Sequence, residues 1–172
     1  MATYKFLRKQ NISDMCIVCG GNNPFGIKTK FYECEREDGE KVLLTMFTPR
    51  DEHQSYPGIT HGGITGAILD EAIGRAANII NPNLWGVTID LSIKYRKTVP
   101  LNEQLYCETW ITKMASRGFE GEGKLFNKDG TVLATGFGKY MILPPDKISE
   151  DGITEKNWYY EDEELPETIT IG

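Results

Sequence analysis

The sequence is short of the features that mark membrane, secreted and nucleic-acid-binding proteins. No stretch of its 172 residues approaches the ~20 apolar residues that a membrane-spanning helix needs. The first segment, MATYKFLRKQNISDMC, lacks the apolar run of a secretory signal peptide. Positive charge is also scarce: the formal net charge is −6 and the pI is about 5.0, whereas a phosphate backbone demands a basic face. These absences predict a cytoplasmic protein that binds neither membranes nor nucleic acid.

Histidine and cysteine are few. The histidines are His53 and His61, and no G-x-S-x-G elbow is present, which argues against a serine hydrolase. The cysteines are Cys16, Cys19, Cys34 and Cys107. In a cytoplasmic protein they are expected to be reduced thiols. Cys16-x-x-Cys19 is half of a four-cysteine zinc site, but a second such pair is missing. We therefore interpret the thiols as structural and predict no metal site.

The composition is that of one folded domain, with 40% apolar and 10% aromatic residues. Alternation of apolar and polar residues predicts strands at Lys28–Glu35, Lys41–Thr48, Val87–Arg96, Leu105–Ala115, Phe119–Asn127 and Val132–Leu143. A long helix is expected between the second and third strands, at Gly62–Ile80. Its apolar residues recur at helical spacing, as at Ile64, Ile68 and Ala72.

This order predicts an α+β fold in which an antiparallel sheet wraps around one long central helix. Because one helix cannot cover such a sheet, a dimer that extends the sheet is expected. Residues 1–143 form the expected domain, with a weakly predicted short helix in residues 1–15 and a turn-rich loop at 16–27. Residues 144–172 form an acidic tail, in which Trp158-Tyr159-Tyr160 is a candidate to dock on the domain.

The candidate catalytic residues lie in the first part of the long helix. Gly62 and Gly63 begin the helix, so their N–H groups lack intrahelical partners and are suited to bind an oxyanion. Asp70 shares a face with the small residues Gly63, Gly66, Gly74 and Ala77. That face leaves room for a substrate or a partner surface. Glu71 points elsewhere, and we interpret it as half of a surface ion pair with Arg75.

Several motifs together resemble the PaaI-like branch of the hotdog-fold thioesterases, in the 4-hydroxybenzoyl-CoA thioesterase superfamily. One is His61-Gly-Gly-x-x-x-x-x-x-Asp70-Glu, preceded by Gln54-Ser-Tyr-Pro-Gly. A second is the loop Cys16-x-x-Cys-Gly-x-x-Asn-Pro-x-Gly-Ile27, and a third is the strand Thr88-Ile-Asp-Leu-Ser-Ile-Lys-Tyr-Arg-Lys-Thr-Val-Pro100. The resemblance covers about residues 16–143.

The resemblance implies an acyl-CoA thioesterase that works as a homodimer or as a homotetramer, a dimer of dimers. Asp70 matches the carboxylate that acts as nucleophile or general base, and Gly62 matches the N–H that polarises the thioester carbonyl. His61 matches a histidine that shapes the turn. Thr88 matches a Ser/Thr lent by the neighbouring subunit. No metal or organic cofactor is implied beyond coenzyme A as part of the substrate.

The sequence departs from the family pattern before the helix. Many relatives have Asn or Gln six residues before the histidine, whereas here Ser55 stands there and Gln54 lies one residue earlier. We expect Gln54 to take over the contact to the carbonyl. The candidates to bind the CoA phosphates are Lys94, Arg96, Lys97 and Arg117, with Arg96 and Lys97 favoured.

Two other functions remain open at this point. One is a hotdog dehydratase or hydratase of 3-hydroxyacyl thioesters, and the other is a non-catalytic acyl-CoA binding module. The sequence leaves the preferred acyl chain undetermined.

Overall fold

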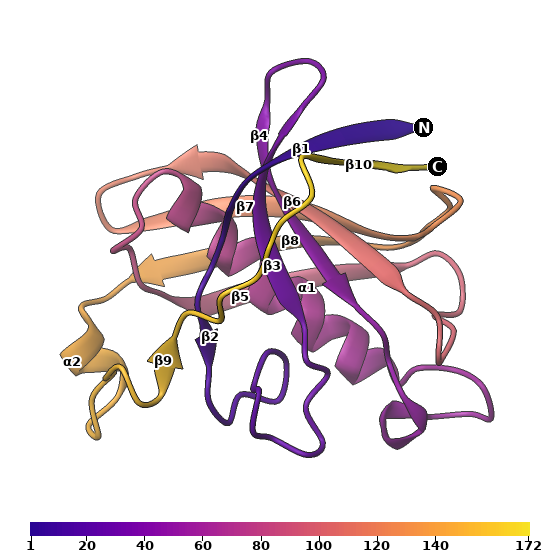
Figure 1. Ribbon diagram of the computed structural model, residues 1–172. Coiled ribbons are helices and arrows are strands. Elements are labelled where there is room, and N and C mark those ends of the chain that lie inside the picture. Colours follow the sequence, from indigo (N-terminus) through magenta and orange to yellow (C-terminus); the bar gives the residue numbers. More distant parts are fainter.

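The computed structural model describes residues 1–172 and consists of one large antiparallel sheet curved around a long helix (Figure 1). The sheet has eight strands in the order β10-β1-β3-β4-β6-β7-β8-β5. Their bounds are β1 Ala2–Lys9, β3 Lys30–Arg36, β4 Lys41–Phe47, β5 Gly86–Tyr95, β6 Leu105–Met114, β7 Gly118–Asn127, β8 Val132–Ile142 and β10 Thr168–Ile171. The predicted sheet around one helix is confirmed. No helix is long and apolar enough to span a membrane.

The central helix α1 runs from Gly62 to Ala76 and continues as the 3-10 turn η2, Ala77–Ile79. Ile68, Leu69 and Ile73 are fully buried against the sheet, and burying each such side chain contributes about 1.5–3 kcal/mol. The sheet approaches the helix closely at Gly121, where a Cβ would lie 2.8 Å from Ile73 Cγ2. Only glycine leaves that space to the helix.

A β-bulge in β5 changes which residues face the helix. Strict alternation predicts Thr88 on the face opposite Ile93. In the structure the pairing of β5 with β8 shifts between Thr88 and Asp90, so that Ile89 is the extra residue. Thr88 thereby lies opposite Tyr140 and turns toward α1, on the same side as Ile93.

The predicted short helix in residues 1–15 is wrong. This segment forms β1 and the short strand β2, Ile12–Ser13. β1 pairs with β3 on one side and with β10 on the other, so the N- and C-terminal ends lie side by side (Figure 1). These long-range pairings satisfy the backbone of an edge that would otherwise be open, which outweighs a weak local helix pattern.

Residues 144–172 follow the surface of the domain and add strands to it. After the short helix α2, Pro145–Ile148, the chain forms β9, Trp158–Tyr159, which pairs with β2. The Trp158 ring packs against Trp85 with a centroid separation of 5.0 Å. The predicted docking of this segment is confirmed.

Candidate active site

The Asp70 carboxylate is held by two hydroxyl groups from the sheet. Thr88 Oγ1 donates a hydrogen bond of 2.8 Å to Asp70 Oδ1. Tyr140 OH lies 3.2 Å from the same oxygen and 2.8 Å from the Asp70 carbonyl oxygen. Burial, followed by the charge of Asp70, raises the pKa of Tyr140, so the phenol stays protonated and donates. The two donors fix the orientation of the carboxylate.

Asp70 and Thr88 line a pocket of about 280 Å³. Its other lining residues come from α1, the segment after it and the strands β5, β8 and β9: Glu71, Gly74, Arg75, Asn78, Pro82, Leu84, Trp85, Gly86, Tyr140 and Trp158. The pocket thus combines one oriented carboxylate with indole and aliphatic walls. Such a mixture of apolar walls and a few placed polar groups is typical of small-molecule sites.

The start of α1 offers one free backbone donor. His61 is the N-cap residue, and its Nδ1 accepts from the Gly63 N–H at 2.9 Å. The Gly62 N–H has no hydrogen-bond partner within the chain, whereas the Gly62 carbonyl accepts from Tyr95 OH at 2.7 Å. The prediction of a free donor at Gly63 is therefore wrong, because the histidine caps it.

Asp70 and the helix start do not share one pocket within the chain. The pocket at Asp70 does not include Gly62 or Gly63. Asp70 lies eight positions after Gly62, which at about 1.5 Å per residue is about 12 Å along the helix. The small residues between them are covered from the sheet: a Cβ at Gly66 would lie 3.1 Å from Ile93 Cδ1. The predicted room on this face is therefore filled at Gly66, whereas Gly74, further along the helix, lines the pocket at Asp70.

Thr88 contacts Asp70 within the same chain. The bulge at Ile89 turns Thr88 toward α1 and so makes this contact. That a neighbouring subunit lends this hydroxyl stays a prediction.

The predicted carbonyl-binding residues lie in the loop before α1 and bond within it. Gln54 Oε1 accepts from the Gly58 N–H at 3.0 Å. Ser55 Oγ donates to the Ile59 carbonyl at 3.4 Å. These contacts close the loop, and only the amide nitrogen of Gln54 remains without a partner in the chain.

The predicted phosphate-binding residues are all exposed and take part in no ion pair within the chain: Lys94, Arg96, Lys97 and Arg117. Lys94 and Arg96 line a groove on the outer face of the sheet. Arg96 and Lys97 follow Tyr95 and therefore lie at the Gly62 end of the site. Arg117 lies at the other end, where its carbonyl accepts from the Ile142 N–H.

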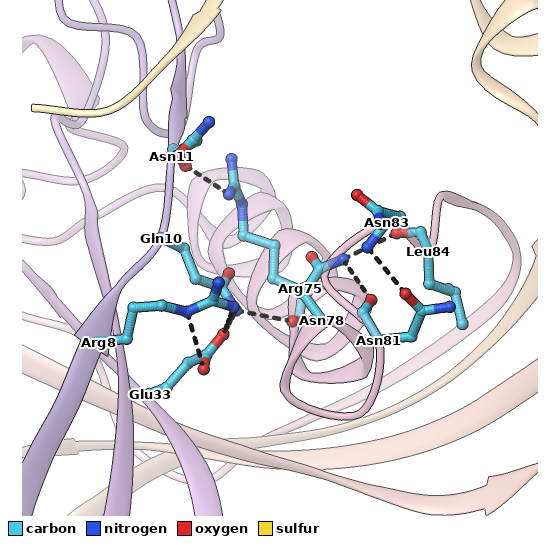
Figure 2. Close-up of polar contacts among 9 residues, drawn as sticks. All are labelled: Arg8, Gln10, Asn11, Glu33, Arg75, Asn78, Asn81, Asn83 and Leu84. Atoms are coloured by element: carbon cyan, nitrogen blue, oxygen red, sulfur yellow. Dashed lines mark hydrogen bonds and ion pairs between the residues drawn. The ribbon is translucent and has the colours of Figure 1, made fainter.

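The ion pair of Glu71 and Arg75 is buried, so its interpretation as surface chemistry is wrong. The Arg75 side chain is 7% exposed and lies 2.8 Å from Glu71 Oε1. Its guanidinium stacks on Phe31 at 4.2 Å and on Trp158 at 4.5 Å. It also donates to the Asn11 carbonyl at 2.7 Å (Figure 2). The N-terminal and C-terminal segments together cover this side of α1.

The fold and the site define a class of protein. An antiparallel sheet wrapped around a central helix is the hotdog architecture, and its helix here presents a carboxylate oriented by two hydroxyl groups. A family model described as the thioesterase superfamily matches residues 57–134. This segment includes the start of α1, Asp70 and Thr88. Over these residues the chain is similar to the thioesterase superfamily, and the match agrees with the hotdog architecture of the fold.

Individual relatives agree with this assignment. The mouse protein acyl-coenzyme A thioesterase THEM5 is 24% identical over 113 residues, which are 65% of this chain and 45% of that protein. The chain thus spans about half the length of its curated relatives. The crystal structure of RHA08564, a thioesterase superfamily protein, has a TM-score of 0.64 at 25% identity and covers 76% of this chain and 61% of that one. The protein BH2602 from Bacillus halodurans, solved with CoA, has a TM-score of 0.54 at 27% identity, covering 58% and 66%.

Proposed function

We propose that this protein hydrolyses acyl-CoA thioesters to a free acid and CoA. The observation that carries the proposal is the Asp70 carboxylate, which Thr88 and Tyr140 hold at the wall of a pocket. The match of residues 57–134 to the thioesterase superfamily supports the reaction class. The name of the THEM5 relative and the CoA bound to BH2602 support the substrate class.

In the proposed reaction the thioester carbonyl oxygen accepts a hydrogen bond from the Gly62 N–H. This donor lies at the positive end of a helix, where negative charge developing on the oxygen is stabilised. Asp70 either removes a proton from an attacking water or attacks the carbonyl carbon itself to give a mixed anhydride that water then hydrolyses. The C–S bond breaks in either case, and the CoA sulfur leaves and takes up a proton. His61 supports the reaction by capping the turn.

Gly62 and Asp70 lie too far apart along α1 to act on one thioester from the same chain. Because about 12 Å separates Gly62 from Asp70, one thioester cannot contact both in the same chain. We propose that Asp70 and Thr88 of one protomer act with Gly62 of another in a homodimer. The outer edge of β5 supports this arrangement, since β5 pairs only with β8 and ends the sheet. Two such edges pairing around a two-fold axis would place the α1 helices side by side.

The same dimer arrangement indicates which cationic side chains bind the CoA phosphates. Arg96 and Lys97 lie at the Gly62 end of each chain, so a partner that brings Gly62 toward Asp70 brings these two as well. We propose that they bind CoA phosphates, with Lys94 and Arg117 as further candidates, and that the free amide nitrogen of Gln54 contacts the carbonyl region. Pairs of dimers would give the tetrameric form.

The two histidines argue against the alternative of a hydratase. Such enzymes pair a catalytic histidine with an acid, but His53 is buried, with Nδ1 bonded to the Arg50 N–H and Nε2 to the Phe25 carbonyl. The Nδ1 atom of His61 accepts a hydrogen bond from the Gly63 N–H. Neither imidazole is hydrogen-bonded to Asp70 within the chain, and thiol release rather than enoyl-CoA hydration is the expected activity.

Asp70→Asn tests the proposal. The amide keeps the shape and the contact to Thr88 but cannot act as base or nucleophile, so CoA release should fall by at least ~100-fold. The assay follows thiol release across short, medium, long and aryl acyl-CoAs, with enoyl-CoA hydration measured in parallel. Asp90→Asn, an exposed residue on the outer face of β5, is the matched control. Equal activity of the two variants would refute the assignment of Asp70, and acyl-CoA binding without turnover in the wild type would indicate a binding module.

A further inference from the structure

A second cluster of reactive side chains lies beside the candidate active site. Cys16 and Cys19, from the N-terminal loop, and Glu71, the neighbour of Asp70 on α1, have ligand atoms within 4.8 Å of one another. We propose that these three residues bind one zinc ion, which ties the loop of residues 16–27 to α1. The sequence pattern alone indicated only structural thiols, because the third ligand comes from a distant helix.

The backbone around Cys16 is shaped to hold a thiolate. Its Sγ accepts from the Val18 N–H at 3.3 Å and lies 3.5 Å from the Cys19 N–H. The turn closes through the Gly20 N–H, which donates to the Cys16 carbonyl at 2.8 Å. A Cβ at residue 20 would lie 2.4 Å from that carbonyl oxygen, so the turn requires glycine. N–H donors directed at sulfur stabilise the thiolate, which is the metal-binding form.

Cys19 receives its own set of donors. Its Sγ lies 3.3 Å from the Ser13 N–H and 3.3 Å from Arg75 Nη2. The same guanidinium donates from Nε to Glu71 Oε1 at 2.9 Å. Arg75 is itself buried, and it orients a thiol and the carboxylate together. Side chains that orient metal ligands from behind in this way are typical of zinc sites.

With both thiols ionised, the cluster of Cys16, Cys19 and Glu71 carries a negative charge that a cation would balance. The Cys16 thiol donates a hydrogen bond to Glu71 Oε2, with the two atoms 3.1 Å apart. A zinc ion would displace that proton and the Cys19 thiol proton, and both would be released to solvent. Two thiolates and one carboxylate carry three negative charges, which Zn²⁺ and the Arg75 guanidinium together balance.

The separation of Cys16 and Glu71 is close to that of two ligands in a tetrahedral site, and all three ligand atoms lie within 4.8 Å of one another. Zn–S bonds of about 2.3 Å and a Zn–O bond of about 2.0 Å set tetrahedral S···O neighbours about 3.5 Å apart. The separation of 3.1 Å between Cys16 Sγ and Glu71 Oε2 is therefore within a few tenths of an ångström of the required one. Three protein ligands leave one position for water. Glu71 and Arg75 also line the Asp70 pocket, so the ion would stabilise one wall of it.

Metal titration of the reduced protein tests the site independently of any thioesterase activity. After treatment with a chelator, the protein should bind one equivalent of Zn²⁺ by elemental analysis. Co²⁺ should give tetrahedral visible bands and a thiolate charge-transfer band in the near ultraviolet. Cys16→Ser should lose that charge-transfer band at stoichiometric Co²⁺, and Glu71→Gln should bind more weakly with the band retained.

Cys34→Ser is the matched control, because Cys34 is a buried thiol in β3 outside the cluster, and it should bind like the wild type. If the Cys16 variant fails to fold, the wild-type spectrum and Glu71→Gln still decide the question. A reduced wild-type chain that takes up neither Zn²⁺ nor Co²⁺ would overturn the proposal. So would a Cys34→Ser variant that loses the band while Cys16→Ser keeps it.

Discussion

Hydroxyl groups from two neighbouring strands orient the Asp70 carboxylate. Thr88 belongs to β5 and Tyr140 to β8, and the two residues lie opposite each other in the strand pairing. Thr88 was predicted as a site residue from the family resemblance. Tyr140 was not, because nothing in a single sequence distinguishes it from any other aromatic residue of a buried strand. Its role becomes visible only when the sheet brings it against α1.

Tyr140→Phe should weaken catalysis while leaving the fold intact. The ring stacks on Phe119 with a centroid separation of 4.9 Å, and phenylalanine keeps that contact. The lost hydrogen bond to a carboxylate is worth about 1.5–3 kcal/mol, so kcat should fall by about tenfold to a hundredfold. Steady-state kinetics measure this, with Tyr160→Phe, an exposed ring, as control. An unchanged kcat in Tyr140→Phe would remove this residue from the site.

At the scale of elements, the C-terminal segment is fastened to the N-terminal strands by charge. Lys9, with a side chain only 1% exposed, lies 3.0 Å from Glu163 Oε2, and Lys30 lies 3.0 Å from Glu163 Oε1. Burial opposes ionisation of Glu163, but the hydrogen bonds from the two lysines prevail and lower its pKa. The acidic run therefore serves partly as a partner for a buried lysine.

This pair predicts a pH-dependent stability. The folded-state pKa of Glu163 lies below its ordinary value of 4.5. The contribution of Glu163 to the unfolding free energy is therefore complete above pH 4.5. It is lost as the pH falls through the pKa of the folded state. Glu163→Gln should cost about 1–2 kcal/mol of unfolding free energy at pH 7. Urea unfolding at pH 7 and near pH 3 measures it, with the exposed Glu164→Gln as control. A difference from wild type that persists undiminished at the lower pH would contradict the account.

Local patterns predicted the elements whose contacts are local. Apolar alternation predicted β3 to β8, and helical spacing predicted α1 with its continuation η2. The strands β1, β9 and β10 escaped prediction because their partners lie far along the chain: Tyr4, for example, pairs with Ile169. The bulge at Ile89 and the burial of Arg75 depend likewise on distant neighbours. The residue types of the site were predictable, but which of them meet in one chain was not.

At the scale of the whole molecule, the account depends on two protomers sharing each active site. Gly62 is the first residue of α1 after its cap, so proline is tolerated there and removes the N–H donor. His61 already has an extended backbone, with φ −60° and ψ 136°, as a residue before proline requires. Gly62→Pro should therefore fold, dimerise and lose thioesterase activity.

Co-expression of Asp70→Asn and Gly62→Pro chains with different tags is the most direct test of this central claim. Each variant alone should be an inactive dimer. A mixed dimer in which one chain supplies Asp70 and the other supplies Gly62 regains one complete site. Random mixing should therefore restore about a quarter of the wild-type thiol release, and isolated heterodimers about half. Heterodimers that stay as inactive as their parents would contradict the account, because both groups would then have to act from the same chain.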